Sequence, residues 1–469
     1  MIFPTGLEVA IMARRFKEPE RDQLYLLPPD VRDWLPEDHD VWFSLDAMDE
    51  LDLSPIYKAY ADLGQPPYSP KTMITIWAYA YASGIRSSRK VEQALHESVP
   101  FRVLAGQLHP DHWTLNNFRK RHEAALKELF HQTVRLAMKA GAVGSKHVAY
   151  DGTKLQGNAS KRKAMSYDRM QKEEKRLKEE IDRYFEEADA IDAEEDRTIG
   201  SRRGDELPKH LGTQQKRLEA IRKAKQALEE EARQKKCEEQ EERRQAAEQE
   251  GRDFHPRTNP EEAVPDPKAQ RNFTDPESRI MKGSGQNFVQ GYNGQAAVDS
   301  ENQIIVAADL TNQASDTPHL PGMIQQTVEN LGKKPKEASA DAGYYSDANL
   351  AHLNDLGIEA YIPPSKVKHS EFRNPVSPRG RIPKDLSPAD RMRRKLKTKK
   401  GRKRYALRMK TVEPVFGQMK GARGLIRLAR RGLEAARSCW FFECAVHNLA
   451  KLCRLAAAAR GLRARAAAR

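Results

Sequence analysis

The sequence has few cysteines and no cysteine pattern that would hold a metal. Only four occur in 469 residues, at positions 237, 439, 444 and 453. No C-x-x-C pair is followed by a second pair, so a zinc site is not expected, and the thiols are expected to be reduced. Cys439, Cys444 and Cys453 fall in an apolar helical stretch, where we interpret them as small core residues.

Long apolar runs are also missing. No segment approaches the ~18 apolar residues that are needed to span a bilayer. The apolar start, residues 1–13, contains Glu8 and follows no basic segment, and Arg14 and Arg15 stand where a small-residue cleavage site would be expected. A signal peptide is therefore not predicted, and we expect a cytoplasmic protein with no membrane partner.

Aromatic residues are scarce at 7%, whereas charged residues make up 32% of the chain. Lys and Arg number 81 against 67 Asp and Glu, which gives a formal net charge of +14. A cationic surface favours a polyanionic partner, and nucleic acid is the commonest one. On charge alone, a basic protein with no role on nucleic acids stays open as the alternative.

Residues 31–143 are predicted to form a helical domain of the DNA-binding type, preceded by an N-terminal extension over residues 1–30. Ser69 and Pro70 place a capping hydroxyl before a proline at the first helical position. An apolar helix is expected from there to Gly84.

Two further helices are expected in this domain, one over residues 88–96 and one that begins at Thr114. The last carries Arg119 and Arg121 in a basic stretch. Short helices that end in a basic one are compatible with a helix-turn-helix DNA reader, in which these two arginines would contact DNA. An ordinary helical bundle is the alternative, and periodicity alone favours it.

A charged insertion with its linker is predicted over residues 161–272. Glu, Lys, Arg, Gln and Ala dominate residues 165–250, which indicates two long polar helices broken near residues 200–212. A thin seam of apolar residues would join them as a helical hairpin: Met170, Leu177, Ile181 and Phe185. The Pro-rich residues 251–271 are interpreted as a linker.

Strand patterns stand on both sides of the insertion, in segments 144–160 and 273–455. Apolar and alternating runs predict strands over residues 146–153, 287–298, 303–310, 337–342 and 358–362. Helices are expected over residues 317–331 and 347–356. This order predicts an α/β fold with a mixed sheet. Residues 391–404 hold ten basic residues, and a basic tail over residues 456–469 is expected to be unstructured.

Three acidic residues stand at positions that suit chemistry. Asp151 and Asp341 each end a short predicted strand, where α/β sheets present functional groups. Glu413 follows the basic stretch. Each alone is better explained as a turn or cap residue, but three carboxylates in a basic protein suit two Mg²⁺ ions, for which Mn²⁺ could substitute. Such ions, ~3.5–4 Å apart, can clamp the attacking and leaving oxygens of a phosphoryl displacement.

Several motifs around these acids resemble those of DDE transposases from bacterial insertion sequences, and most closely the insertion-sequence group numbered eleven-eighty-two. Tyr405, Arg408, Glu413 and Lys420 resemble the Tyr-Arg-Glu-Lys signature of that family. The other matching motifs are YDGTK at 150–154, NAS at 158–160, AMSY at 164–167, GYN at 291–293, QAAVD at 295–299 and ADAGYYS at 340–346. Together the motifs cover nearly the whole chain.

The resemblance implies an RNase H-like catalytic fold with flanking helices, in which Asp151 and Asp341 lie on adjacent strands and Glu413 lies on a following helix. The insertion would lie between the first and second strands. It also implies that Asp151, Asp341 and Glu413 bind the metal ions, and that Tyr405, Arg408 and Lys420 contact DNA near the scissile bond. The implied partners are the transposon ends and the target duplex, the working form is implied to be a homodimer, and the location is the nucleoid.

One departure from the family signature concerns the spacing before the glutamate. Four residues separate Arg408 from Glu413 here, where three are usual in the family, and Pro414 follows directly. A residue before proline is pushed away from helical geometry, so Glu413 is expected at a helix start or kink, with Pro414 in the first turn.

Three functions are weighed on these residues. The first is a transposase that binds terminal inverted repeats, hydrolyses a phosphodiester at each transposon end and joins the freed 3′-hydroxyl to target DNA. The second is a catalytically silent DNA-binding protein derived from a transposase. The third is a general RNase H-like nuclease. The intact trio of acids favours an enzyme, and the helical N-terminal region favours recognition of specific ends.

Overall fold

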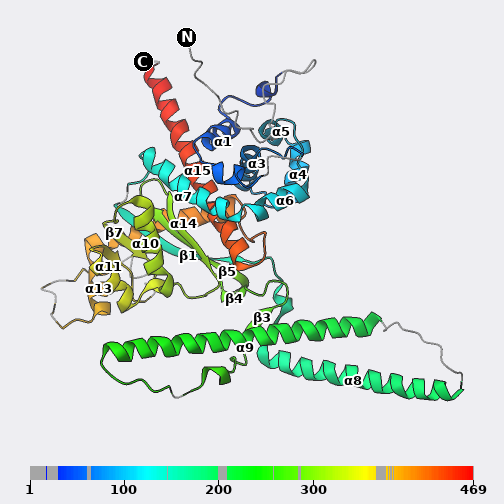
Figure 1. The fold of residues 1–469 in the computed structure, drawn as a ribbon. Coiled ribbons are helices and arrows are strands. Elements are labelled where there is room, and N and C mark those ends of the chain that lie inside the picture. The colour runs from blue at the N-terminus through cyan, green and yellow to red at the C-terminus, as the bar shows by residue number, and fades with distance from the viewer. Residues whose placement is uncertain are drawn as a thin grey trace, which may run out of the picture. The chain divides into compact units, whose positions relative to one another are not determined.

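The computed structural model describes residues 17, 30–60, 65–144, 146–198, 209–256, 258–283, 287–365, 377–378, 380, 383 and 385–467. The chain divides into two compact units, of which the first comprises Met1–Leu155 with Asn293–Arg469 and the second Gln156–Tyr292 (Figure 1). Of the N-terminal extension predicted over residues 1–30, all but residues 17 and 30 lie outside the described residues. None of the described helices is both long and apolar enough to cross a lipid bilayer.

Short helices make up the N-terminal part of the first unit. They are η1 (Val31–Trp34), α1 (Asp40–Asp49), α2 (Ser54–Tyr57), α3 (Pro70–Ala82), α4 (Ser88–Glu97), α5 (Val99–Ala105), α6 (His112–Arg121) and α7 (Glu123–Lys139). Helix α3 begins at the predicted proline, which needs no hydrogen-bond donor there. Helix α6 begins two residues earlier than predicted, because Asp111 caps it by accepting from the Thr114 amide at 2.7 Å.

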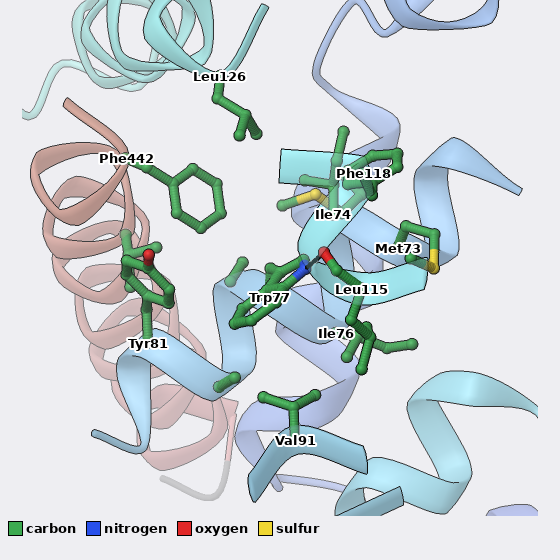
Figure 2. Packing of buried hydrophobic residues seen from close by; sticks show 14 of the residues in the cluster. Met73, Ile74, Ile76, Trp77, Tyr81, Val91, Leu115, Phe118, Leu126 and Phe442 are labelled. Atoms are coloured by element: carbon green, nitrogen blue, oxygen red, sulfur yellow. Dashed lines mark hydrogen bonds between the residues drawn. The ribbon is translucent and has the colours of Figure 1, made fainter. Parts of the chain in front are cut away.

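The core of these helices packs around Trp77 (Figure 2). The indole Nε1 of this buried residue donates to the Leu115 carbonyl of α6 at 3.2 Å. Phe442, from the C-terminal helix α15 (Leu433–Ala467), packs edge-on against Tyr81 with ring centroids 5.0 Å apart. Helix α15 also packs against α7 and β6 (Ile305–Thr311). The end of the chain therefore belongs to the same core as its N-terminal helices.

The predicted unstructured tail over residues 456–469 is wrong as far as it is described, since α15 continues through Ala467. Alanine and arginine are strong helix formers. Adding residues to an existing helix avoids the unfavourable nucleation step.

The sheet is mixed, as predicted. Its strands are β1 (His147–Gln156), β4 (Arg279–Lys282), β5 (Phe288–Asp299), β6, β7 (Glu337–Ala340) and β8 (Glu359–Tyr361). The order is β4-β5-β1-β7-β8, with β6 also paired to β5. Strand β7 runs parallel to both β1 and β8, whereas β5 is antiparallel to β4 and β6. Tyr150 pairs with Ala340, so the residues that follow them lie side by side, Asp151 within β1 and Asp341 directly after β7. Strand β1 continues to Gln156, so the prediction that Asp151 ends its strand is wrong.

Helices follow the strands of the first unit close to the predicted positions. They are η5 (Thr317–His319), α10 (Leu320–Leu331), α11 (Asp347–Asp355), α13 (Pro388–Lys397) and α14 (Lys399–Gly417), and a π-helical turn over Gln418–Ala422 follows α14. Helix α10 packs on β6, and α14 packs on β7 and β8. The basic stretch predicted over residues 391–404 therefore forms α13 and the start of α14.

The second unit contains the charged hairpin. Its elements are β2 (Ala164–Ser166), α8 (Tyr167–Thr198), α9 (Lys209–Gln249), η3 (Pro260–Glu262) and β3 (Gln270–Asn272). Met170, Leu177 and Ile181 pack with Leu218, Ile221, Ala224 and Leu228 in the seam between α8 and α9, as the apolar spacing predicts. The side chain of Phe185 lies outside the described residues. Strand β3 pairs with β2, so the segment expected to be only a linker also contains a strand.

Candidate active site

The two aspartates are placed by the parallel pairing of β1 and β7. Asp151 lies inside β1, and Asp341 follows β7 directly as the residue that caps η6 (Ala342–Tyr344). The Asp341 carboxylate accepts from the Gly343 amide at 2.9 Å, and Asp151 accepts from the Gly152 amide at 2.9 Å. Both carboxylates are therefore oriented by a backbone amide of a glycine that follows them closely in the chain.

Arg408 connects the third acid to this pair. Its Nη1 donates to Asp151 Oδ2 at 2.7 Å, and its Nη2 donates to Glu413 Oε1 at 3.0 Å. The side chains of Arg408 and Asp151 are each only 15% exposed, whereas that of Glu413 is 44% exposed. One guanidinium from α14 thus spans a carboxylate of the sheet and a carboxylate of its own helix.

The prediction that Glu413 lies at a helix start, with Pro414 in the first turn, is wrong. Glu413 lies within α14, and Pro414 is accommodated inside the same helix. A proline in a helix leaves the carbonyl four residues earlier without its usual donor. Here that carbonyl, on Lys410, accepts from Gln303 Nε2 at 2.9 Å. A contact from the loop between β5 and β6 therefore replaces the lost helical hydrogen bond.

Burial makes ionisation of Asp151 unfavourable. The pKa of its carboxyl is raised to about 7, mainly by desolvation. The negative charges of Asp341 and Asp316 also raise this pKa, whereas the positive charge of Arg408 lowers it. A buried carboxylate beside two others needs additional positive charge to stay ionised at neutral pH.

The remaining residues of the predicted signature lie around this site. Tyr405 lies under Arg408, whose guanidinium carbon is 6.0 Å from the ring centroid. Lys420 lies in the π-helical turn, where its Nζ donates to the backbone carbonyl of Lys154 at 2.9 Å. Burial lowers the Lys420 pKa and raises that of Tyr405. DNA contact by either side chain stays a prediction.

Of the two arginines predicted to contact DNA from α6, Arg119 requires correction. It is 4% exposed, its guanidinium carbon lies 3.7 Å from the Trp77 ring centroid, and it donates to the Tyr81 hydroxyl at 3.1 Å. The side chain therefore lies in the helical core and stabilises it. The run of basic residues did not reveal this, because residues two positions apart on a helix face nearly opposite directions. Arg121 is exposed, lies over the Tyr60 ring at 4.6 Å and donates to the Ala59 carbonyl.

Sequence reasoning missed two residues that the structure makes prominent. Trp113 is 69% exposed at the start of α6, although a tryptophan in a helical domain is expected in the core. Asp316 lies beside the two aspartates and accepts hydrogen bonds from Asn293 and Gln295 of β5. Only one feature of the sequence could have indicated this polar site. Asn293 and Gln295 are two residues apart, so both lie on the same face of a strand.

The three acids imply a divalent cation as the ligand of this site. Among the described residues, no group of three or more His, Cys, Asp or Glu side chains is placed so that it could hold a metal ion. The positive charge between Asp151 and Glu413 is the Arg408 guanidinium. Carboxylate oxygens are nevertheless the ligands that Mg²⁺ prefers, and one or two carboxylates commonly hold it together with substrate phosphates. The residues present fit Mg²⁺ on that basis.

A mixed sheet that places two aspartates side by side on neighbouring parallel strands, with an arginine joining one of them to a helical glutamate, defines a class of candidate phosphodiester-processing enzymes. Residues 29–121 match the family model described as Transposase domain (DUF772), and residues 264–449 match the one described as Transposase DDE domain. Together the matches support a DDE transposase of the insertion-sequence type, which acts on DNA and generally depends on divalent metal. The mixed α/β architecture fits an RNase H-like domain of this kind.

The two matches cover the site unequally. Asp341 and Glu413 lie inside the DDE match, whereas Asp151 lies in residues 122–263, which neither match covers. Asp151 is therefore placed beside the other acids by the β1–β7 register and by Arg408. A search of curated proteins and a search of solved structures each found no match.

Proposed function

We propose that this protein binds the terminal inverted repeats of an insertion sequence, hydrolyses a phosphodiester at each end by two-metal catalysis and joins the freed 3′-hydroxyl to target DNA. The observation that carries the proposal is the pairing of Tyr150 with Ala340, since it brings Asp151 and Asp341 side by side on neighbouring strands. Paired transposon ends require at least a homodimer in the working complex, and the site of action is the nucleoid.

In this mechanism Asp151, Asp341 and Glu413 hold the metal. When bound, two Mg²⁺ ions, or Mn²⁺ in their place, activate the attacking oxygen and neutralise charge on the leaving oxygen. Arg408 exchanges its carboxylate partners for a DNA phosphate, because a guanidinium binds either anion with the same forked geometry. Lys420 adds positive charge beside β1, where the scissile strand would lie.

The DNA backbone is expected to run along α13 and α14. Exposed basic side chains on these helices are Arg391, Arg393, Lys397, Lys399, Lys400 and Lys403. Contacts of this kind are independent of base sequence and release counterions, so DNA affinity should fall steeply with salt. Sequence recognition is assigned to the N-terminal helices, where Arg121 and Trp113 are exposed.

The direct test measures cleavage of duplex DNA that carries the inverted repeats flanking the gene, in Mg²⁺ and in EDTA. We expect nicks at the repeat ends that require the metal, and joined products when target DNA is added. Glu413→Gln should lose both reactions, whereas Asp355→Asn, on an exposed end of α11, should keep them. Equal cleavage of scrambled ends would support the general nuclease instead, and tight binding without nicking in any divalent metal would support the silent DNA-binding protein.

A second prediction concerns Trp113 as a DNA contact. The other four tryptophans are buried or half-buried, so iodide should quench mainly the fluorescence of Trp113. Binding of terminal-repeat DNA should protect this residue from iodide. Trp113→Phe should weaken DNA binding about tenfold, equivalent to about 1.4 kcal/mol, since the smaller phenyl ring gives less apolar contact with base edges than the indole.

The matched control is Trp34→Phe, in which a half-buried ring under Arg102 is replaced. This variant should keep both the DNA affinity and the protection from iodide. If DNA leaves the quenching of the wild-type protein unchanged, α6 does not present Trp113 to DNA.

A further inference from the structure

A fourth carboxylate lies beside the two candidate catalytic aspartates. Asp316 precedes η5 and is partly buried. Its Oδ1 accepts hydrogen bonds from Lys154 Nζ at 3.1 Å, Asn293 Nδ2 at 2.6 Å and Gln295 Nε2 at 2.8 Å. Since three donors from β1 and β5 meet one oxygen, the carboxylate is held in a single orientation.

Each oxygen of Asp316 faces a glycine close to one of the candidate catalytic aspartates. A Cβ on Gly152, directly after Asp151 in β1, would lie 2.5 Å from Asp316 Oδ1. A Cβ on Gly343, two residues after Asp341, would lie 3.3 Å from Asp316 Oδ2. Both glycines therefore give the carboxylate the space that it occupies, between β1 and the turn after Asp341.

The loop of Asp316 is also tied to the Asp341 turn through its next residue. Thr317 Oγ1 donates to the Gly343 carbonyl at 2.7 Å. Asn349 Nδ2 donates to the carbonyls of both Thr317 and Tyr344 at 2.8 Å. Movement of this loop would therefore move the turn that orients the Asp341 carboxylate.

On the other side the same loop is attached to β1. Lys154 Nζ donates to the Ala314 carbonyl at 2.9 Å in addition to its ion pair with Asp316. The backbone carbonyl of Lys154 in turn accepts from Lys420. These contacts fix the loop to the strand that carries Asp151.

We propose that Asp316 is a positioning residue for phosphodiester cleavage, because it holds the β1 backbone at Asp151 and the turn after Asp341 at a separation at which both carboxylates bind the same divalent cation. The inference rests on the proposed function. Asp316 itself need not touch the metal or the DNA. It acts through the strand and the turn, whose carboxylates would otherwise be free to separate under their mutual repulsion.

The test measures Mn²⁺ binding to the DNA-free full chain by electron paramagnetic resonance, together with the Mg²⁺ concentration that gives half-maximal cleavage of terminal-repeat DNA. Asp316→Ala should raise the Mn²⁺ dissociation constant about 10–100-fold, the usual effect of losing a residue that orients metal ligands. The Mg²⁺ requirement should rise in proportion, and saturating Mg²⁺ should restore most of the rate. Asp316→Asn, which keeps the shape but loses the charge, should shift both values less.

The control is Asp309→Asn, since Asp309 is also ion-paired, to Arg437 Nε at 3.1 Å, but does not face Gly152 or Gly343 in the described network. It should leave Mn²⁺ affinity unchanged.

A folded Asp316→Ala variant with wild-type Mn²⁺ affinity would overturn the inference, even if its stability to urea were lower. If the alanine variant does not fold, the asparagine variant decides in the same way. A wild-type chain that binds Mn²⁺ without cutting DNA would overturn the proposed function, and the Mn²⁺ measurement would still decide the role of Asp316.

Discussion

Replacing Asp151 with asparagine should abolish DNA cleavage and at the same time stabilise the metal-free protein at pH 8. The loss of activity should reach about a thousandfold or more, because bound metal contributes several kcal/mol to the transition state of phosphoryl transfer. The gain in stability follows from burial, which makes the ionised carboxylate costly in the absence of metal.

The sign and pH window of the stability effect follow from the raised pKa of Asp151. Its carboxyl titrates near pH 3.8 when unfolded and at about 7 in the folded chain. The favourable contribution is therefore complete below pH 3.8 and is lost as the pH rises through 7. Between pH 4 and pH 8 the wild type should lose about 4 kcal/mol relative to Asp151→Asn. In the Asp151→Asn variant Arg408 keeps its ion pair with Glu413, so its charge still has a partner.

The measurement is the free energy of unfolding in urea, followed by tryptophan fluorescence, since all five tryptophans lie in the first unit. The difference between the two proteins isolates Asp151. Buried His147 and His447, whose pKa values burial lowers to about 4 and about 3, add an opposite trend that both proteins share. Mg²⁺ should stabilise the wild type at pH 8 and have less effect on the variant. A difference that does not change with pH would show that Asp151 is not desolvated.

The second large effect is expected from Glu443, a buried acid in α15. Its side chain is 1% exposed and is ion-paired with Arg86, which is 10% exposed and also donates to the Arg423 carbonyl at 2.7 Å. Glu443→Ala would leave the buried Arg86 guanidinium without its anion. Removing one partner of a buried pair in this way costs about 3–5 kcal/mol, so the urea midpoint should fall sharply.

A double variant distinguishes the ion pair from simple packing. Arg86→Met combined with Glu443→Leu replaces both charges with apolar side chains of similar size and should recover most of the lost stability. The control is Glu128→Ala, which breaks the exposed pair with Arg135 and should cost less than about 1 kcal/mol. If the double variant is as unstable as the sum of the single variants, the two side chains do not act as a pair.

The order of strands and helices in the first unit could be predicted because each leaves a local pattern. Helix α3 is marked by Pro70 at its first position, and β5 and β6 by alternation on either side of a polar turn. The start of α6 was missed because a cap depends on one side chain, Asp111, whose effect is not visible in hydrophobic spacing.

The candidate acids could be chosen from the sequence, but the charges around them could not. Asp151 and Asp341 each follow a short apolar run, which is a local feature. That Arg408 bridges Asp151 and Glu413, and that Pro414 fits inside α14, depends on contacts between residues far apart in the chain. Arg119 shows the same difficulty, since its burial against Trp77 depends on how α3 and α6 pack.

The sequence by itself determined the basic character of the protein, the mixed strand order, the polar hairpin and three candidate acids, because composition and local patterns are properties of the chain alone. The tertiary structure decided which strand lies beside β1, and hence that Asp151 meets Asp341 across 189 intervening residues. It also decided that Asp316 stands between β1 and the turn after Asp341. Pairing and burial are made by residues distant in sequence, so no local pattern records them.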